Sequence, residues 1–514
     1  MMLPRSLSAL VLAAVALAAP ASDAQSMYLD IHGGGLGQTV ELNLSGPPST
    51  RYLLLMSFVY APTPFPGQPV GSIDVGLELL NTCLALPGFF GYLPTSGQLT
   101  LPIPVPNNPP LDGANLNFQL LRVIGNKATE KSNPWRLTFD TPGDYTATIG
   151  GGLAQARAFA TNTELDDGTV LIAGGGTGSI TSATGLSSVE LYRPNLEAFA
   201  SMPAMNSARA LHKATKLLDG RVLITGGVDA GSVPLASAEV YDPVTGTSTF
   251  TANMQIARAA HTSTLLPDGR VLITGGSSDL STDTSFATSA ERSTEIFNPG
   301  TMSFASGPNM SEPKTFHDAT VLSNGNVLVT GGITYYVIFI KIPDLSNTAQ
   351  VYTPGTAPAV GSFGSSIGMG TKRAAHTSVL LDDGRVLVAG GASGSLLAPT
   401  ILSSCSLFTG SGFSAAGGMA TPRAISGLVK LENGQVLAAG GANGDLLNPS
   451  AIISCELYTP APPSGAGSWA SAGNMTTSRS GQGALLLSDG TIGLIAGGGG
   501  VSNVALSSAE IYQP

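Results

Sequence analysis

The sequence is poor in charged residues, which make up 11% of its 514 positions. It holds 23 lysines and arginines against 33 aspartates and glutamates, so its formal net charge is −10. So little charge argues against long solvated helices and favours many short strands. Because a nucleic-acid surface needs a basic field that this chain lacks, we expect no nucleic-acid partner.

Long hydrophobic runs are also missing beyond the N-terminus, so we expect a soluble mature chain without membrane insertion. Residues 1–24 are typical of a secretory signal peptide. Arg5 supplies the positive start, Leu7 to Ala19 form an apolar stretch too short to span a bilayer, and Ser22 to Ala24 are small. A buried N-terminal helix is the alternative. The signal predicts a secreted, periplasmic or cell-surface protein.

Cysteine is scarce too, and the odd set of Cys83, Cys405 and Cys455 cannot make a disulfide framework. Cys405 and Cys455 occupy the same place in two adjacent copies of the repeat described below. We interpret them as small buried residues, with a bridge between the two as the alternative.

Glycine, by contrast, is abundant, with 65 residues, and much of it belongs to an internal repeat. The unit is Arg-x-x-(His)-x-x-x-x-Leu-x-(Asp/Asn)-Gly-x-Val-Leu-x-x-Gly-Gly, then a variable loop, then Ser-x-Glu-x-Tyr-x-Pro. Successive turn glycines lie 49 to 59 residues apart, which suits four strands per unit. They are Gly168, Gly220, Gly269, Gly325, Gly384, Gly434 and Gly490. Seven copies are therefore present, and the double glycine of the last is expected at Gly497 and Gly498.

Each part of the unit has a physical reason. The Asp-Gly or Asn-Gly pair supplies the positive φ angles of a tight hairpin. The second strand, such as Val222 to Ile224, is continuously apolar, which indicates burial on both faces. The double glycine provides backbone without side chains where another strand approaches. A fourth strand carries an aromatic residue in six units, namely Phe199, Phe250, Phe304, Phe363, Phe413 and Trp469.

The seventh unit ends at Pro514, directly after its third strand, and so lacks a fourth. The segment from Thr141 to Thr148 resembles a fourth strand, with Tyr145 at the aromatic position. If this segment pairs with the strand that ends at Tyr512, the sheets close into a ring without an open edge. We predict this closure, which favours seven units over six.

The double glycine after an apolar strand, the third-strand Tyr and the fourth-strand aromatic resemble kelch repeats. The Arg-x-x-His variant is similar to the central domain of galactose oxidase-like proteins. The resemblance implies an all-β fold with a seven-bladed kelch-type β-propeller over residues 139–514, closed by an N-terminal strand. An open solenoid is the alternative.

Residues 25–138 share none of this pattern and form a predicted β-rich, sandwich-like domain. Tyr52 to Phe58, Leu99 to Ile103 and Asn115 to Arg122 are the predicted strands. Adhesion, carbohydrate binding and shielding of the propeller remain open as roles for this domain.

Histidine occurs five times, and four of these residues share one repeat position. They are His212, His261, His317 and His376. Imidazoles gathered near a propeller axis could bind a metal. The other three units carry Ala160, Ser426 and Gln482 at this position, so we predict a structural role and no metal site.

A basic residue opens every unit, and five units carry a glutamate in the third strand. The basic residues are Arg157, Arg209, Arg258, Lys314, Arg373, Arg423 and Arg479. The glutamates are Glu190, Glu239, Glu295, Glu456 and Glu510. A cationic ring for an anionic ligand is one hypothesis. Internal Arg–Glu pairs explain both patterns better, and the unit of Lys314 has Gln350 in place of Glu.

The galactose oxidase resemblance implies a copper ion held by two tyrosines and two histidines, with a tyrosine cross-linked to a cysteine. This sequence departs from that pattern, because His32 is the only histidine outside the repeat position. Cys405 and Cys455 both lie at repeat positions. We therefore predict no cofactor and no catalytic residues.

Variable loops remain as carriers of function, because loops from second to third strands share one face of a propeller with those from fourth to first. Two are enlarged, Ser277 to Arg292 and Ile333 to Asn347. The predicted ligand-binding residues are Asp279, Asp283, Arg292, Tyr335, Tyr336, Phe339 and Lys341. Alternatively, the second loop tucks over the channel mouth or against the N-terminal domain.

Taken together, these features predict an exported, non-catalytic binding or scaffold protein that recognises a protein or glycan through the loop face. The alternative is a secreted oxidase or carbohydrate-active enzyme with a site at the channel mouth.

Overall fold

The structure is a computed structural model of the 514-residue chain. It describes residues 27–514 except 34, 37, 58–59, 65–71, 76–78, 80–82, 85, 87, 106–113, 125–126, 140–141, 148–151, 179–181, 396–397, 445–448, 463–464 and 500–503. The predicted signal peptide at 1–24 lies outside the described residues. No helix in the described part of the chain is long and apolar enough to cross a membrane.

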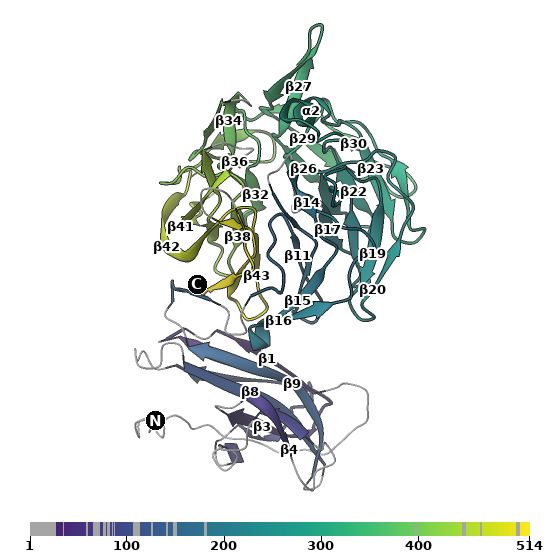
Figure 1. The fold of residues 1–514 in the computed structure, drawn as a ribbon. Helices are drawn as coiled ribbons and strands as arrows, with labels where there is room; N and C mark the ends of the chain where they lie inside the picture. Colours follow the sequence, from purple (N-terminus) through teal and green to yellow (C-terminus); the bar gives the residue numbers. More distant parts are fainter. Residues whose placement is uncertain are drawn as a thin grey trace.

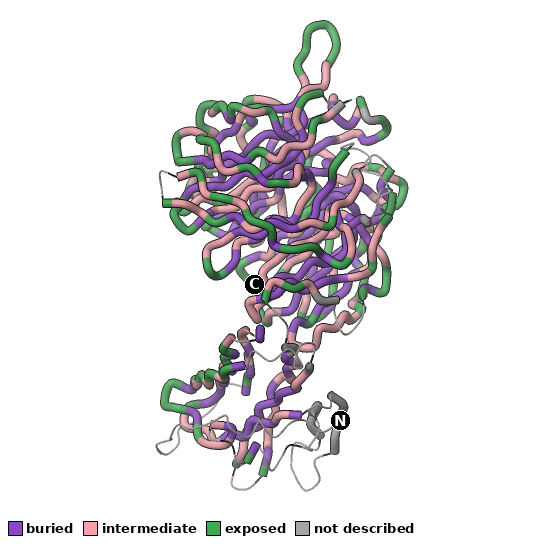
Figure 2. Tube along the Cα trace, turned by 90° about the vertical axis from the view of Figure 1, so that its left-hand side faces the viewer, coloured by how far each residue is buried: buried purple, intermediate pink, exposed green. Residues whose placement is uncertain are grey.

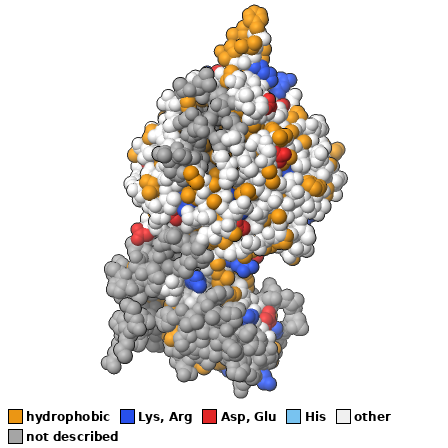
Figure 3. Space-filling view, in the orientation of Figure 1, with side chains coloured by type: hydrophobic (Ala, Val, Ile, Leu, Met, Phe, Trp, Pro, Cys, Tyr) orange, Lys and Arg blue, Asp and Glu red, His pale blue; other side chains and the backbone are white. Residues whose placement is uncertain are grey.

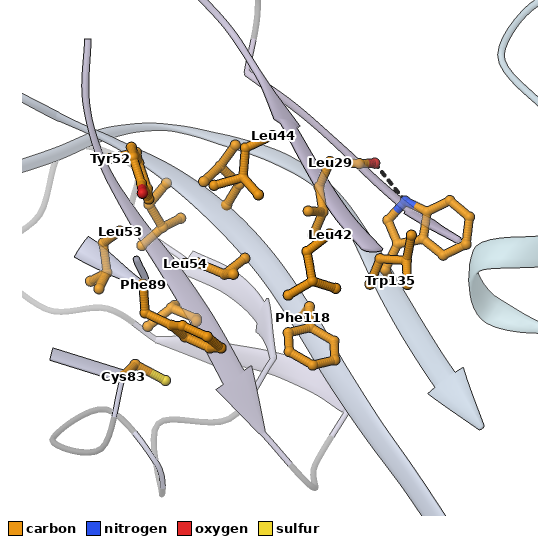
Figure 4. Packing of buried hydrophobic residues seen from close by; sticks show 14 of the residues in the cluster. Leu29, Leu42, Leu44, Tyr52, Leu53, Leu54, Cys83, Phe89, Phe118 and Trp135 are labelled. Carbon is orange, nitrogen blue, oxygen red and sulfur yellow. Dashed lines mark hydrogen bonds between the residues drawn. The ribbon is translucent and has the colours of Figure 1, made fainter. Parts of the chain in front are cut away.

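The N-terminal part is built from antiparallel strands that enclose a hydrophobic core (Figure 4). One sheet has the order β1 (Tyr28–His32), β2 (Thr39–Ser45) and β7 (Gln98–Pro104). A second has the order β6 (Phe90–Tyr92), β3 (Arg51–Ser57), β8 (Ala114–Ile124) and β9 (Lys127–Phe139). A hairpin adds β4 (Tyr60–Pro64) and β5 (Ser72–Val75). Strands β3, β7 and β8 match the three predicted strands.

From residue 145 onward, the described residues form seven larger antiparallel sheets, arranged around a common centre (Figure 1). The first contains β11 (Thr161–Glu164), β12 (Val170–Ala173), β15 (Val189–Arg193) and β16 (Ala198–Met202). The second contains β17 (Lys213–Lys216), β18 (Val222–Thr225), β19 (Ala238–Asp242) and β20 (Thr247–Phe250). The third contains β21 (Thr262–Leu265), β22 (Val271–Thr274), β23 (Thr294–Asn298) and β24 (Ser303–Ser306).

The remaining four sheets repeat the order. The fourth contains β25 (Asp318–Val321), β26 (Val327–Thr330), β29 (Thr348–Thr353), β30 (Ser362–Phe363) and β31 (Ile367–Gly368). The fifth contains β32 (Thr377–Leu380), β33 (Val386–Ala389), β36 (Cys405–Phe408) and β37 (Phe413–Ala415). The sixth contains β38 (Gly427–Lys430), β39 (Val436–Ala439), β40 (Ala442–Gly444), β41 (Pro449–Thr459) and β42 (Ser468–Arg479). The seventh contains β43 (Gly483–Leu486), β44 (Ile492–Ile495), β47 (Ala509–Tyr512) and β10 (Tyr145–Ala147).

The seventh sheet joins the two ends of this region. Strand β10 pairs with β47 so that Tyr145 lies opposite Tyr512, as the sequence predicts, and their ring centroids are 4.8 Å apart. The first strands contact one another in the circular order β11, β17, β21, β25, β32, β38, β43 and back to β11.

The repeat positions explain the sheets. Each turn glycine has a φ between +75° and +85° and closes the hairpin from first to second strand. Every second strand is buried along its whole length. Buried residues run through the interior of this region, and exposed residues lie toward its outside (Figure 2). In most units the third-strand aromatic packs on the fourth-strand aromatic, as in Tyr192 with Phe199. Phe250 of β20 differs, because it lies opposite Glu239 of β19 and its side chain is half exposed.

The double glycines lie where adjacent sheets meet. The Gly227 N–H donates to the Arg258 carbonyl of the next unit at 2.9 Å. Within its own unit, a Cβ on Gly227 would come within 2.5 Å of the Ala210 carbonyl oxygen and 2.7 Å of His212 Cβ. In the seventh unit the predicted pair is shifted by one residue, because Ala496 and Gly497 have the positive φ angles and contacts of the pair elsewhere. The prediction of Gly497 and Gly498 was therefore wrong, and an alanine fits the first position of this unit.

The N-terminal part contacts the face that carries the hairpin turns (Figure 1). The Gly33 N–H donates to the Asp489 carbonyl at 3.1 Å, and Arg136 Nη1 donates to the Leu196 carbonyl at 3.3 Å. Leu196 ends the 3₁₀ turn η4 (Pro194–Leu196). The N-terminal part therefore contacts part of the turn face, whereas the enlarged loops lie on the opposite face.

Candidate functional site

All six arginines that open repeats are fully buried, and five of them pair with third-strand glutamates, as predicted. Arg423 is representative. Its guanidinium donates to Glu456 Oε1 at 2.7 Å, to the Gly440 carbonyl at 2.7 Å and to the Ser454 carbonyl at 2.8 Å. Each arginine thus ties the end of a second strand to the start of a third, and these guanidinium groups are not open to a ligand.

The glutamates also accept backbone N–H groups from the loop before each arginine. Glu456 accepts the N–H of Ala420 at 2.7 Å and of Thr421 at 3.0 Å. Burial raises the pKa of its carboxyl, but these hydrogen bonds and Arg423 outweigh burial and lower the pKa below the usual value. The Glu456 carboxylate is therefore a charged structural acceptor.

Two units depart from this pattern. Lys314 pairs with Glu312 at 2.7 Å, a residue two positions away that the sequence analysis did not single out, and Gln350 accepts the Ser311 N–H. Arg373 faces Ser406 Oγ at 3.3 Å where other units have glutamate. Among the described residues, no ion pair of Arg373 is found. The fourth unit thus keeps a buried cation with a carboxylate partner, although Gln350 stands in place of the third-strand glutamate.

The four repeat histidines are buried at the seams between sheets. His261 Nε2 is 2.8 Å from Thr225 Oγ1 of the preceding unit, and His376 Nε2 is 2.8 Å from Thr330 Oγ1. Gln482 takes the same role in the seventh unit by donating to the Ala439 carbonyl at 2.8 Å. Burial, together with the nearby basic residues, lowers the pKa of His212 and of His317 to about 3. The imidazoles are neutral seam residues.

An apolar ring lies where the first strands begin, on the loop-bearing face. Each member is the third residue of its repeat, counted from the opening Arg or Lys. All members have a left-handed φ between 49° and 57°. They are Phe159, Leu211, Ala260, Phe316, Ala375, Ile425 and Gly481. Six backbone hydrogen bonds, such as Ala375 N–H to the Phe316 carbonyl at 2.9 Å, join neighbouring members.

The sequence analysis missed this ring, because nothing in Phe, Leu or Ile signals a left-handed backbone. The ring makes the centre of the loop face apolar, with no acid, base or metal ligand among its side chains. A catalytic site at this position would have to draw its polar groups from the loops.

The loop from Ser277 to Arg292 covers part of the ring with the short helix α2 (Asp283–Thr288). Phe286 of α2 packs edge-on against Phe316 at 5.4 Å between centroids. Asp279 accepts the N–H of Ser281 at 2.8 Å, and this hydrogen bond lowers the pKa of its carboxyl. Asp283 is the first residue of the helix, and Arg292 is exposed.

The loop from Ile333 to Asn347 forms a hairpin of β27 (Ile333–Val337) and β28 (Lys341–Leu345) that projects from the loop face (Figure 1). Tyr336 and Phe339 are exposed, whereas Tyr335 lies under the Lys341 ammonium, which is 4.3 Å from its ring centroid. Lys341 also donates to the Thr288 carbonyl of α2 at 2.5 Å. The two enlarged loops are thus joined, and the hairpin neither closes over the ring nor meets the N-terminal part.

All three cysteines are buried, and Cys405 and Cys455 are not bridged to each other. Burial raises the pKa of Cys405 to about 11 and raises that of Cys455. The disulfide between Cys405 and Cys455, which the sequence left open as an alternative, is therefore not formed.

The residues present do not fit the copper site of galactose oxidase. The repeat imidazoles bond threonines inside the seams, and His32 lies at the N-terminal contact, 3.8 Å from both Asp30 and Glu432. Within the described ranges, no group of three or more His, Cys, Asp or Glu residues could hold a metal ion. No reaction step through copper follows from this arrangement.

Comparisons with known proteins agree with the fold. The Kelch motif matches residues 216–255. A solved structure titled "Novel fungal alcohol oxidase with catalytic diversity among the AA5 family, in complex with copper" is similar with a TM-score of 0.54 and 19% identity, over 72% of this chain and 76% of that chain. "Structure of YjhT" matches with a TM-score of 0.45 and 13% identity, over 60% of this chain and 97% of that one. No curated protein matches.

The chain therefore has an all-β fold with a kelch-type β-propeller similar to that of galactose oxidase-like proteins.

Proposed function

We propose that this chain is an exported, non-catalytic binding or scaffold protein that recognises a protein or glycan through the loop face of its propeller. In this proposal residues 1–24 are a signal peptide, residues 25–138 a sandwich-like domain and residues 139–514 a seven-bladed ring closed by the strand of Tyr145. The protein would act outside the cell, in the periplasm or at the cell surface.

The observation that carries the proposal is the contrast between the repeat and the loops. The repeated charged and imidazole groups are buried in pairs within and between sheets. The unrepeated polar and aromatic groups lie on two joined loops that stand free of the N-terminal part. Exposed aromatic and basic side chains on a rigid support are typical of recognition surfaces.

The seven-bladed ring is supported by the circular order of contacts among the first strands and by the pairing of β10 with β47. The sandwich-like domain is supported by two sheets that share one core, from which Leu29, Leu42, Leu54, Phe118 and Trp135 are drawn in Figure 4.

An oxidase or carbohydrate-active enzyme is the second candidate, and it rests on the similarity to the fungal alcohol oxidase. At 19% identity that similarity speaks to the fold and not to the site. The apolar ring at the centre of the loop face favours binding over this alternative.

Two surveys test the proposal: a glycan array probed with the purified chain, and a pull-down from the surroundings of the exporting cell. We expect a ligand whose binding falls at least tenfold in the Tyr335→Ala/Tyr336→Ala variant and is unchanged in Val244→Ala, an exposed residue in the turn between β19 and β20. A ligand that both variants bind equally well, with unchanged folding, would place recognition elsewhere.

A further inference from the structure

The tip of the β27–β28 hairpin is the most prominent apolar feature of the surface. Phe339 is 98% exposed, Ile340 71%, Val337 66% and Ile338 62%. These four residues are consecutive, and none of their side chains can donate or accept a hydrogen bond. Figure 3 shows hydrophobic side chains covering this projection, with basic side chains directly beneath it.

The hairpin is held upright rather than folded onto the sheets. Its base is anchored by Ile333 and Leu345, which are 0% and 1% exposed, and Lys372 pairs with Asp344 at 2.7 Å. Its two strands of five residues extend for about 16 Å. The tip therefore stands away from the molecule in a fixed shape, and ordering it on binding costs little.

A second copy of the chain is a poor occupant for this tip. The exposed side chains of the tip amount to on the order of 500 Å², whereas a stable interface buries about 800 Å² on each partner. A glycan would find no hydrogen-bonding group at the tip.

We infer that residues 337–340 insert into the interface of a lipid bilayer and hold the loop face against it. A fluid apolar phase needs no matching pocket, so a convex tip of four apolar side chains suits it. The residues just below have the chemistry of a membrane interface: Tyr336 is amphipathic and half exposed, and Lys341 is an exposed cation whose ammonium lies over the Tyr335 ring.

The depth of insertion is limited by the hairpin's backbone. Val337 pairs with Lys341 and Tyr336 with Ile342 across the hairpin, but a two-stranded hairpin has two outer edges whose polar groups need water. The tip therefore enters the headgroup region and not the hydrocarbon centre. We expected no membrane insertion because the sequence beyond the N-terminus lacks a segment that could span a bilayer. The contact inferred here is different, because only the tip of the hairpin enters the headgroup region.

Electrostatic attraction contributes little to this contact. The chain carries a net charge of −10, and the nearby Asp344 and Lys372 neutralise each other. Binding should therefore occur on zwitterionic lipid and should resist salt. The inference builds on the proposed loop-face function, and it adds a lipid contact that is separate from the protein or glycan ligand.

The test is flotation of the purified chain with phosphatidylcholine vesicles, with and without about 1 M sodium chloride. We expect the wild type to float in both conditions and Phe339→Asp to lose at least ten-fold in partition coefficient. Val244→Asp, which changes a 93% exposed side chain elsewhere, should float like the wild type. In Phe339→Trp, vesicles should shift the added tryptophan emission to the blue.

Three results would overturn the inference: a wild type that stays unbound, equal flotation of Phe339→Asp and wild type, or flotation only with anionic lipid at low salt. A wild-type dimer that Phe339→Asp converts to monomer, seen by sedimentation without lipid, would also overturn it and assign the tip to self-association. Ligand binding on the glycan array is measured without lipid, so failure of either proposal is seen separately.

Discussion

In five of the seven units, a buried arginine joins three structural parts: a second strand, a third strand and a glutamate. The pairing was predictable, because Arg and Glu recur together in the same units. The pair of Lys314 with Glu312 was not, because Glu312 lies outside the repeat pattern and replaces the carboxylate from a different position. A pattern shared by the repeats predicts the ion pair that most units form. It does not predict a residue outside the pattern that replaces the carboxylate in a single unit.

Arg423→Met should destabilise the protein by about 3–5 kcal/mol, because it leaves Glu456 charged and buried without its partner. Arg373→Met is the matched control, since Arg373 has Ser406 where Arg423 has a glutamate. Its loss removes hydrogen bonds only and should cost about 1–3 kcal/mol. Urea unfolding measures both, and equal losses would contradict the role given to the carboxylate.

The seam histidines make stability depend on pH. Their folded-state pKa values are lowered, to about 3 for His317, so below pH 6.5 the unfolded chain binds protons that the folded chain does not. Stability should therefore fall as the pH drops from about 6.5 toward 3, by up to about 1.4 kcal/mol per pH unit for each histidine.

His317→Gln should flatten this dependence, because a glutamine serves the same seam at Gln482. Unfolding free energies of the variant and wild type, compared between pH 6 and 5, measure the difference. Parallel curves would show that His317 does not titrate as the structure implies.

At the scale of elements, the seams between sheets depend on backbone that carries no side chain. Most of the sheet order was predictable, since the turn and double glycines mark the ends of each second strand. The one-residue shift of the pair in the seventh unit was not predictable. Ala496 fits the first position of the pair in this unit, and only the structure shows that it occupies this position.

Gly227→Ala should cost more than 3 kcal/mol, because the new Cβ would lie 2.5 Å from the Ala210 carbonyl oxygen. Gly370→Ala is its control: its φ is +76°, but no atom lies within 4 Å of the added Cβ. That change should cost only about 1–2 kcal/mol of backbone strain. Equal losses of stability in the two variants, measured by thermal unfolding, would contradict this account. They would show that only the positive φ, and not the close approach of the Ala210 carbonyl, requires glycine at position 227.

The loops are the elements that the sequence predicted least well. Their length marked them as candidates, but composition could not show that Lys341 joins α2 or that the hairpin stands upright. These outcomes depend on contacts between loops far apart in the chain, such as Lys341 with Thr288.

At the scale of the whole molecule, the two ends of the propeller region hold its ring together. Removal of residues 509–514 deletes β47, which lies between β44 and β10, and should open the proposed ring. We expect loss of cooperative thermal unfolding and rapid hydrogen exchange in β44. An unchanged melting temperature in the truncated chain would favour an open solenoid.

The propeller region also has two unlike faces: the N-terminal part contacts the turn face near Leu196 and Asp489, and the enlarged loops project from the other face (Figure 1). The sequence could not predict which face is contacted, because the contacts, such as Gly33 with Asp489, carry no repeat or motif. We therefore assign the proposed recognition to the loop face.

The central claim is that the repeat uses its polar residues for structure and leaves function to the loops. Metal analysis of the purified full chain, after incubation with copper and exhaustive dialysis, tests it most directly. We predict far less than one copper per chain, because the imidazoles are buried against threonines and the cysteines are buried. Retention of one copper per chain would contradict the claim and favour the oxidase.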